Sequence, residues 1–200
     1  MTTDAHLPTG LRGRKKARTR VLIQEAALRL FHERGYAATT VGQIAAAADV
    51  SERTFFRYFP TKADTVLYDR VHPRLIEAFL GEPAELPPLA AFRAAYRSVY
   101  ARHSASDAAV ERQRQQLISE VEELDAITAV NIRSRMAALA EALSRRTGLP
   151  SDDPRVRAWV GAISGVSLAA YLAWASDPAR RSISELVDEG LALLEAGLPL

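Results

Sequence analysis

Four polar side chains in one short segment, Glu52, Arg53, Thr54 and Arg57, have the types and spacing needed to contact DNA bases. An arginine guanidinium donates as a planar fork that matches the two acceptors of guanine in the major groove. Glu52 could accept a hydrogen bond from the amino group of cytosine. On a helix of residues 52–58 these side chains lie near the N-terminus and on the outer face, from which a recognition helix reaches base edges. The segment therefore predicts a DNA-reading helix, with Arg53 and Arg57 as its leading base readers.

Capping residues predict the two helices that must hold this segment in place. Thr40 and Gln43 have the spacing of a capping box, so a helix is expected over residues 41–48. Asp49 tolerates a turn conformation, and Ser51 can cap the second helix. Helix, turn and helix in this order form a unit whose second helix fits a major groove.

Aromatic residues of the second helix admit two interpretations. Phe55 and Phe59 have the spacing that commonly forms a small core between helices, and we expect both to be buried. Tyr58 could either join that core or contact DNA.

Charge is distributed unevenly along the chain. Residues 1–65 hold 11 Lys and Arg against 6 Asp and Glu, whereas residues 66–200 hold 15 against 18. A positive face attracts phosphates without regard to base sequence. The basic segment from Arg12 to Arg20 could be an ordinary solvated surface, could track phosphates, or could enter the minor groove. The two parts of the chain are therefore expected to have different partners, with DNA as the partner of the first.

The first third of the chain contains a turn, two helix caps, an aromatic pair and a lysine, all at matching positions of one motif. The residues of this motif are Gly35-Tyr36, Thr39-Thr40-Val41, Ile44-Ala45, Ala48, Val50-Ser51, Thr54, Tyr58-Phe59 and Lys62. This run resembles the N-terminal domain of TetR-type transcriptional regulators. The resemblance implies phosphate contacts by Thr40, Tyr58 and Lys62, and it places Gly42 and Gln43 where some relatives reach the groove.

One position departs from the family pattern. Phe56 stands where many relatives carry a tyrosine, so it has no hydroxyl to hydrogen-bond a phosphate, although the ring can still press on a thymine methyl. The predicted DNA-binding set is Thr40, Gly42, Gln43, Ser51, Glu52, Arg53, Thr54, Phe56, Arg57, Tyr58 and Lys62.

Apolar residues recur three and four positions apart along almost the whole chain without strand-like alternation, which predicts an all-α fold of about nine helices. Pro73 should kink or break the fourth helix, because proline removes a backbone donor.

We expect an N-terminal three-helix, helix-turn-helix DNA-binding domain with a basic arm over residues 1–62. A C-terminal helical ligand-binding and dimerisation domain is expected over residues 63–200. Further helices are predicted at about 14–34, 88–103, 106–119, 122–147, 153–176 and 183–197.

Several classes of protein are excluded by what the 200-residue sequence lacks. It has no cysteine, which excludes disulfides, thiolate metal sites and cysteine nucleophiles. Its four histidines show no metal-binding spacing, and the second half has no glycine-rich phosphate loop, nucleophile elbow or His-x-x-x-His pair. We therefore expect no metal, no cofactor and no enzymatic activity. Without a secretory signal or about 20 uninterrupted apolar residues, a cytoplasmic protein with no membrane partner is predicted.

Aromatic and polar residues on two predicted helices favour a small-molecule site. A buried His103 or Asn131 could be satisfied inside the fold or could orient a ligand in an apolar pocket. Leu117, the Glu120 to Leu124 stretch, the Arg133/Arg135 pair and Arg146-Thr-Gly148 resemble the TetR branch that senses acyl-CoA-like ligands. The predicted ligand-binding set is Phe92, Tyr96, Tyr100, His103, Leu117, Ile127, Asn131 and Ser134.

A DNA duplex offers two half-sites to a two-fold symmetric reader, so we expect a homodimer on a palindromic operator. The family resemblance implies a four-helix seam formed by the last two helices of each copy. The predicted interface consists of Trp159, Ile163, Val166, Ala170, Leu186, Leu191 and Leu194. From the residues alone, the same stripes suit an intramolecular core equally well.

These features together predict a ligand-responsive, sequence-specific transcriptional regulator, specifically a repressor released from its operator by a small hydrophobic or acyl-CoA-like effector. Release would require the effector to prefer a dimer whose reading helices are mis-spaced. One alternative is a ligand-independent dimeric DNA-binding protein, which would have a closed interior. The other is a helical-bundle carrier or enzyme, whose activity would not depend on Arg53, Arg57 and Lys62.

Overall fold

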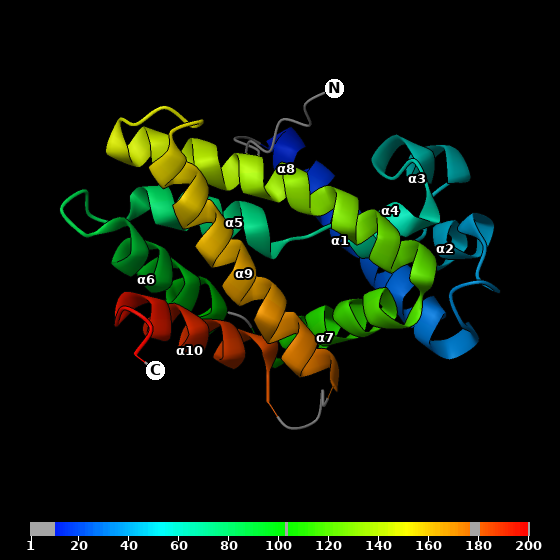
Figure 1. The fold of residues 1–200 in the computed structure, drawn as a ribbon. Helices are drawn as coiled ribbons and strands as arrows, with labels where there is room; N and C mark the ends of the chain where they lie inside the picture. Colours follow the sequence, from blue (N-terminus) through cyan, green and yellow to red (C-terminus); the bar gives the residue numbers. More distant parts are fainter. Residues whose placement is uncertain (1–10, 103, 177–180, 200) are drawn as a thin grey trace. The chain divides into compact units, whose positions relative to one another are not determined.

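The structure, a computed structural model, describes residues 11–102, 104–176 and 181–199, and every regular element in these ranges is an α-helix (Figure 1). The ten helices in this part of the chain are α1 (Leu11–Arg34), α2 (Val41–Ala47), α3 (Glu52–Tyr58), α4 (Lys62–Leu67), α5 (Val71–Gly81), α6 (Pro88–Ala101), α7 (Ala105–Glu120), α8 (Glu122–Thr147), α9 (Pro154–Ser176) and α10 (Ile183–Glu195). The predicted all-α fold is confirmed, and the helix ends lie close to the predicted ones.

A break in the fourth predicted helix adds a helix to the expected number. α4 ends at Leu67 and α5 begins at Val71, so the chain leaves the helical conformation before Pro73 rather than at it. Pro73 stands in the first turn of α5, where a backbone N–H has no acceptor within the helix and its loss costs little. The disturbance predicted near Pro73 is therefore a complete break, shifted upstream because a proline is compatible with a helix start.

The chain forms two compact units, and neither is a single stretch of sequence. The first unit holds the described residues up to Asp69 together with Ala105–Thr128. The second holds Arg70–Ser104 and the described residues from Ala129 onward. This division differs from the predicted contiguous domains, which meet after residue 62, because α4, α7 and the first turns of α8 share one core with α1, α2 and α3.

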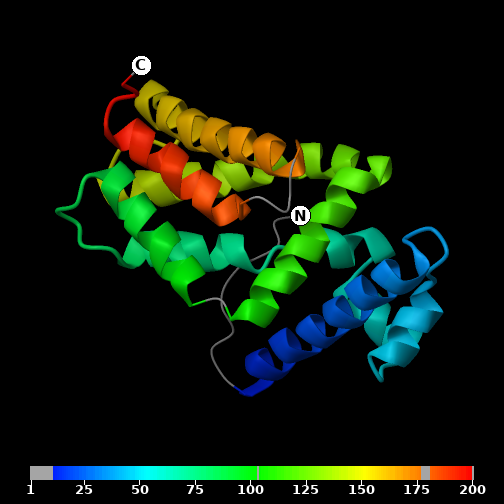
Figure 2. The same ribbon diagram turned by 90° about the horizontal axis from the view of Figure 1, so that it is seen from below.

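The first unit is built around α1, which packs against α2, α4 and α7, while α3 packs on α2 (Figure 2). Phe55 and Phe59 are buried, as predicted, and their rings lie 6.0 Å apart between centroids. The same core includes Ile23, Leu28, Phe31, Ile44, Val66, Ile118 and Leu124. The inner face of α3 is therefore fixed by packing, and its outer face is left to solvent.

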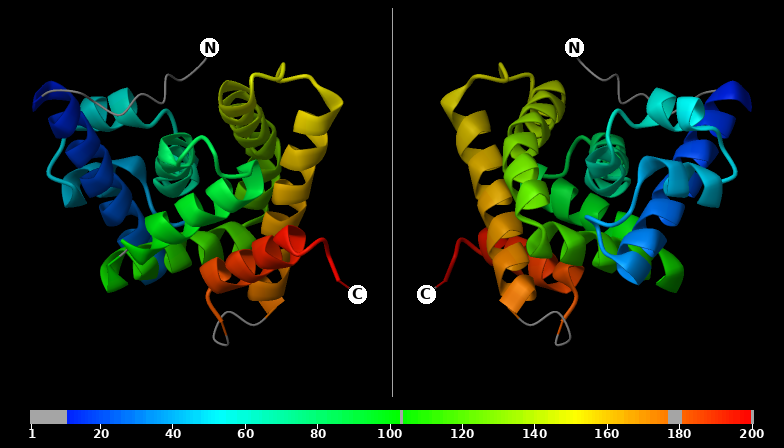
Figure 3. Two further views of the ribbon diagram at one scale, coloured as in Figure 1. Left: turned by 90° about the vertical axis from the view of Figure 1, so that its left-hand side faces the viewer. Right: turned by 90° about the vertical axis from the view of Figure 1, so that its right-hand side faces the viewer.

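The second unit packs α6 against α5 and α10, and α9 against α10 (Figure 3). Three aromatic rings from three helices meet in its core, with centroids 5.7 Å apart for Phe79 and Trp159 and 5.5 Å apart for Phe92 and Trp159. An ion pair adds a polar link between α6 and α10, because Arg93 Nε donates to Asp188 Oδ1 at 3.0 Å. Contacts within one chain thus bury much of the apolar surface of these helices.

Arg146 of α8 holds the end of α5 and the loop that follows it. Its guanidinium donates to the backbone carbonyls of Glu82 at 2.8 Å and Leu86 at 3.1 Å, and also to that of Pro83. The guanidinium carbon also lies 5.5 Å from the centroid of the Phe79 ring. These contacts give Arg146, one of the residues on which the resemblance to acyl-CoA sensors rests, a structural task within the second unit.

Candidate nucleic-acid interface

The helix caps predicted for α2 and α3 are present. Thr40 Oγ1 accepts from the Gln43 backbone N–H at 3.2 Å, and the Gln43 side chain accepts from the Thr40 backbone N–H at 3.0 Å. Ser51 Oγ accepts from the Thr54 backbone N–H at 3.1 Å. Asp49 takes a left-handed conformation, with φ of 52°, in the turn between the helices. Only residues 48–51 separate the two helices, as a helix-turn-helix requires.

The outer face of α3 carries the side chains expected to read bases. Glu52, Arg53, Phe56 and Arg57 are all exposed, and Phe56 keeps 51% of its surface accessible. They recur at the three- and four-residue spacing of one helical face, opposite the buried Phe55. The structure therefore brings together four of the predicted DNA-binding residues on one surface.

Tyr58 and Thr54 lie at the border between this face and the core, since both are half-buried. The Arg57 guanidinium carbon lies over the Tyr58 ring, 5.3 Å from its centroid. A phenol beside a guanidinium at a helix end is well suited to a phosphate oxygen. A phosphate contact by Tyr58 stays a prediction.

Gly42 allows a close approach between α2 and α3. A Cβ atom at this position would lie 2.8 Å from Glu52 Oε1, closer than ordinary packing permits. The Glu52 carboxylate therefore folds against the first turn of α2 instead of extending freely from α3.

A groove of about 520 Å³ joins the start of α1 to α3. Its lining combines three cations with hydroxyl and apolar groups, namely Lys15, Lys16, Thr19, Val50, Thr54, Arg57 and Tyr58. Lys15, Lys16 and Thr19 were not among the predicted site residues, although the basic composition of the Arg12 to Arg20 segment was a signal for them. Positive charge thus continues from the outer face of α3 onto α1, which extends the surface that attracts phosphates.

Lys62 has a structural role that its residue type did not indicate. Its Nζ donates to the backbone carbonyls of Tyr36 at 2.7 Å, Thr39 at 3.2 Å and Ala37 at 3.4 Å. The ammonium also lies 4.3 Å from the centroid of the Tyr36 ring. Three carbonyls match the three protons of the ammonium, so Lys62 fixes the turn that leads into α2. Its phosphate contact stays a prediction and would need one of these hydrogen bonds to be exchanged.

Tyr36 completes this turn from the core side. Its hydroxyl donates to Glu123 Oε1 at 3.5 Å, and burial together with the nearby Glu123 charge raises the pKa of Tyr36 to about 12. The phenol is therefore neutral at physiological pH, and it contributes a hydrogen bond and a ring face to the first unit.

The predicted ligand-binding residues are divided between the two units. Phe92 and Tyr96 are buried in the core of the second unit, where the Tyr96 and Tyr100 rings lie 4.5 Å apart between centroids. Leu117 and Ile127 pack against the core of the first unit. In the second unit Asn131 is half-buried and Ser134 is exposed, while His103 falls outside the described residues.

All seven predicted dimer-interface residues contribute to the core of the second unit, and their part in a dimer stays a prediction. Ile163, Ala170 and Leu191 are buried, and Trp159, Val166, Leu186 and Leu194 pack against the same cluster. The physical reason is the close contact of α9 with α10, where the Val166 side chain lies directly over Gly190. The stripe that the periodicity identified is the inner face of α9.

The opposite face of α9 is apolar and exposed. Leu168 keeps 51% and Leu172 58% of their surface accessible, and Gly161 and Gly165 lie on the same side. By length and composition α9 also qualifies as a helix that could cross a membrane, with 22% of its most apolar stretch buried, although core helices meet the same criterion. α9 is therefore an exception to the prediction that no segment has the length and composition of a membrane helix.

Comparison with known proteins covers both units. Residues 23–67 match the family of bacterial regulatory proteins called tetR, and residues 86–199 match the MftR C-terminal domain. MftR of Mycobacterium tuberculosis, a putative mycofactocin biosynthesis transcriptional regulator, is 28% identical over 190 residues, which cover 93% of this chain and 94% of MftR. The HTH-type transcriptional regulator TcmR of Streptomyces glaucescens is 42% identical over 95 residues, which cover 46% of this chain and 42% of TcmR.

Among solved structures, FadR of Thermus thermophilus, a TetR family transcriptional repressor in complex with lauroyl-CoA, is similar with a TM-score of 0.54 and 26% identity. The match covers 90% of this chain and 95% of FadR. The segment matched to the tetR family contains both caps and the whole of α2 and α3. The chain therefore belongs to the TetR family and is a DNA-binding transcriptional regulator.

Proposed function

We propose that the chain is a dimeric, ligand-responsive repressor that reads a palindromic operator with α3 and is released by a small hydrophobic or acyl-CoA-like effector. The observation that carries the proposal is the exposed outer face of α3, where Arg53 and Arg57 reach solvent and Arg57 lines a groove together with Lys15 and Lys16. Arginine forks on this face would read guanine, and the lysines would hold the flanking phosphates. Regulation of this kind works through binding alone and needs no chemical step.

Selection of genomic fragments with the purified protein tests the DNA-binding part. We expect the enriched fragments to share two inverted half-sites centred about one helical turn, or a multiple of it, apart. Enrichment of single, unpaired half-sites would contradict a dimeric reader. A set of fragments with no common sequence would contradict specific reading by α3.

The dimer is supported by the exposed apolar face of α9. Leucine side chains beside glycines leave an apolar surface over which a second helix can pack closely, and burial of that surface from water would favour association. We assign this face to a second copy of the chain in place of the buried residues predicted from the sequence. A cytoplasmic location, where the operator is found, agrees with this assignment. Sedimentation of the purified protein and its flotation with phospholipid vesicles distinguish a dimer from a membrane-bound helix.

The effector is supported by the similarity to FadR and by the aromatic core of the second unit. Trp159 Nε1 is buried beside Phe79 and Phe92, and it is a donor without a hydrogen-bond partner among the described residues. A buried polar group of this kind is the type of anchor that orients a ligand in an apolar site. An acyl chain with a polar head could use both the rings and the donor.

Titration of a preformed operator complex with lauroyl-CoA tests the effector. Release at micromolar concentrations is expected, and Trp159→Phe, which keeps the ring packing but removes the donor, should raise the concentration required. Phe92→Leu serves as a comparison, because it alters the packing and leaves the Trp159 donor in place. If neither lauroyl-CoA nor a panel of other hydrophobic compounds acts, the ligand-independent alternative would replace this proposal.

A further inference from the structure

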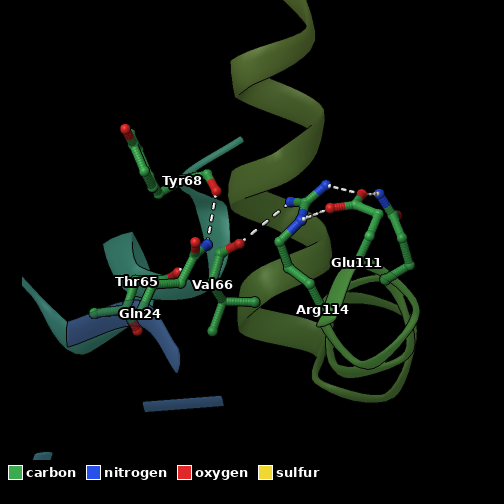
Figure 4. A network of polar contacts seen from close by, with 7 residues as sticks. Gln24, Thr65, Val66, Tyr68, Glu111 and Arg114 are labelled. Atoms are coloured by element: carbon green, nitrogen blue, oxygen red, sulfur yellow. Dashed lines mark hydrogen bonds and ion pairs between the residues drawn. The ribbon is translucent and has the colours of Figure 1, made fainter. Parts of the chain in front are cut away.

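The C-terminal end of α4 is held by side chains from two other helices (Figure 4). Gln24 of α1 donates from Nε2 to the carbonyl oxygens of Thr65 at 2.9 Å and Tyr68 at 2.8 Å. Arg114 of α7 donates from Nη1 to the carbonyl oxygen of Val66 at 3.2 Å. The last carbonyls of a helix have no donor within it. These two side chains therefore supply the donors that α4 lacks.

The donors are deeply buried and the cation among them is paired. Gln24 is 1% and Arg114 3% exposed. Glu111, one turn earlier on α7, accepts from Arg114 Nε at 2.9 Å and from Nη2 at 2.6 Å. A buried charge is tolerated when it is paired and fully hydrogen-bonded. Glu111 thus compensates the guanidinium charge and aims its remaining nitrogen at Val66.

The hydrogen bond between Arg114 and Val66 connects two helices that are far apart in the sequence. α4 ends shortly before the chain passes into the second unit at Arg70, and α7 is the first helix after the chain returns at Ala105. At its other end, α4 follows α3 after only residues 59–61. The hydrogen bond between Arg114 and Val66 therefore ties the helix next to the DNA reader to the helix that follows the second unit.

We propose that Arg114, aimed by Glu111 and assisted by Gln24, is a positioning residue for operator binding. It fixes the end of α4 to α7 and thereby sets how α3 is presented to DNA. The inference rests on the proposed DNA-reading function of α3. A purely apolar packing role would be met by a side chain of similar size, whereas donation to the Val66 carbonyl needs the guanidinium.

The double variant Glu111→Leu/Arg114→Met tests this role. Removal of both charges leaves no unpaired ion in the core, and such apolar replacements of buried pairs are often neutral for stability. We expect only a modest fall in the unfolding temperature, because the Val66 carbonyl loses its donor, while operator affinity falls about tenfold, a size typical of residues that act through others. Arg112→Met is the matched control, because Arg112 is an exposed cation on the same helix, and it should bind the operator like the wild type.

Hydrogen exchange separates positioning from general loosening. In the double variant, the amides of residues 62–70 should exchange faster, whereas those of residues 23–31 in α1 should keep their protection. Gln24→Met, which removes two donors without changing charge, should reproduce both the affinity loss and the local exchange pattern.

Unchanged operator affinity in both variants would overturn the inference while leaving the proposed function intact. The inference would also fail if affinity were lost only in proportion to global stability, with faster exchange throughout the first unit. Failure of the wild type to bind any operator would overturn the proposed function, and this inference with it.

Discussion

α3 and α9 each bury one face in the core of a unit and expose the other, and the exposed faces differ in chemistry. α3 presents Glu52, Arg53, Phe56 and Arg57 to solvent, whereas α9 presents Gly161, Gly165, Leu168 and Leu172. A charged face gains free energy by meeting phosphates and base edges, and an apolar face gains it by leaving water. The comparison teaches that residues outside the two cores set the chemistry of each exposed face, which suits α3 to DNA and suits α9 to the apolar contact that we propose with a second copy.

The largest effect is expected from placing charge on the apolar face of α9. Leu168→Glu with Leu172→Glu would bury two unpaired carboxylates in the proposed seam, which is strongly unfavourable. We expect a monomer in sedimentation velocity, and operator binding weakened about a hundredfold or more, because one copy holds a single half-site. Leu22→Glu, at an exposed leucine of α1, is the control for added charge. A double variant that remains dimeric would show that the seam lies elsewhere.

Arg57→Ala tests whether the outer face of α3 reads bases. Loss of a bidentate contact to guanine should cost about 1–3 kcal/mol of binding free energy and relax the preference at one base pair of each half-site. Binding to operators substituted at each position in turn measures both effects. An equal loss on every sequence would identify Arg57 as a phosphate contact instead of a base reader.

The lysines of the groove beside α3 are expected to contribute the salt-dependent part of the DNA-binding free energy. Lys15→Gln with Lys16→Gln should reduce the slope of log K against log salt by about one for each phosphate that the protein no longer neutralises, with little change in base preference. Affinities measured across a salt series give the slope. Arg145→Gln, an exposed cation of α8, should leave it unchanged.

The smallest effect is expected at Gly42. Gly42→Ala should raise the free energy of unfolding by about 0.5–1 kcal/mol, because alanine is favoured over glycine inside a helix. The new methyl would displace the Glu52 carboxylate, so operator affinity should change by less than in Arg57→Ala. Glu52→Ala should have a matching effect on affinity if the carboxylate is the cause. Chemical denaturation and operator titration of both variants check this.

The contrast between α3 and α9 also shows which features of the fold and the site can be predicted from the sequence. The caps at Thr40, Gln43 and Ser51 act within three residues, so local spacing was sufficient to place α2 and α3 and their outer face. The face of α9 that enters the core depends on α10, and periodicity identifies an apolar stripe without showing what covers it. The prediction consequently selected the inner face, with Ile163 and Ala170, whereas the face that we propose for the second copy includes Leu168.

Long-range contacts account for the other differences. Lys62 has the residue type of a phosphate contact, but its ammonium lies on carbonyls of a turn more than twenty residues earlier in the chain. The assignment of α7 to the first unit depends in the same way on Ile118 packing against α1, and on Arg114 reaching the end of α4. No local pattern in the sequence encodes these partners.

Competition binding tests most directly whether the outer face of α3 reads DNA. The operator obtained by fragment selection would be measured against random duplex at fixed salt, for the wild type and for Arg53→Ala/Arg57→Ala. We expect the wild type to prefer the operator by about a thousandfold or more, and the variant to lose most of this preference while it retains salt-sensitive binding to any duplex. A wild type without preference, or a variant with undiminished preference, would contradict the assignment of base reading to α3.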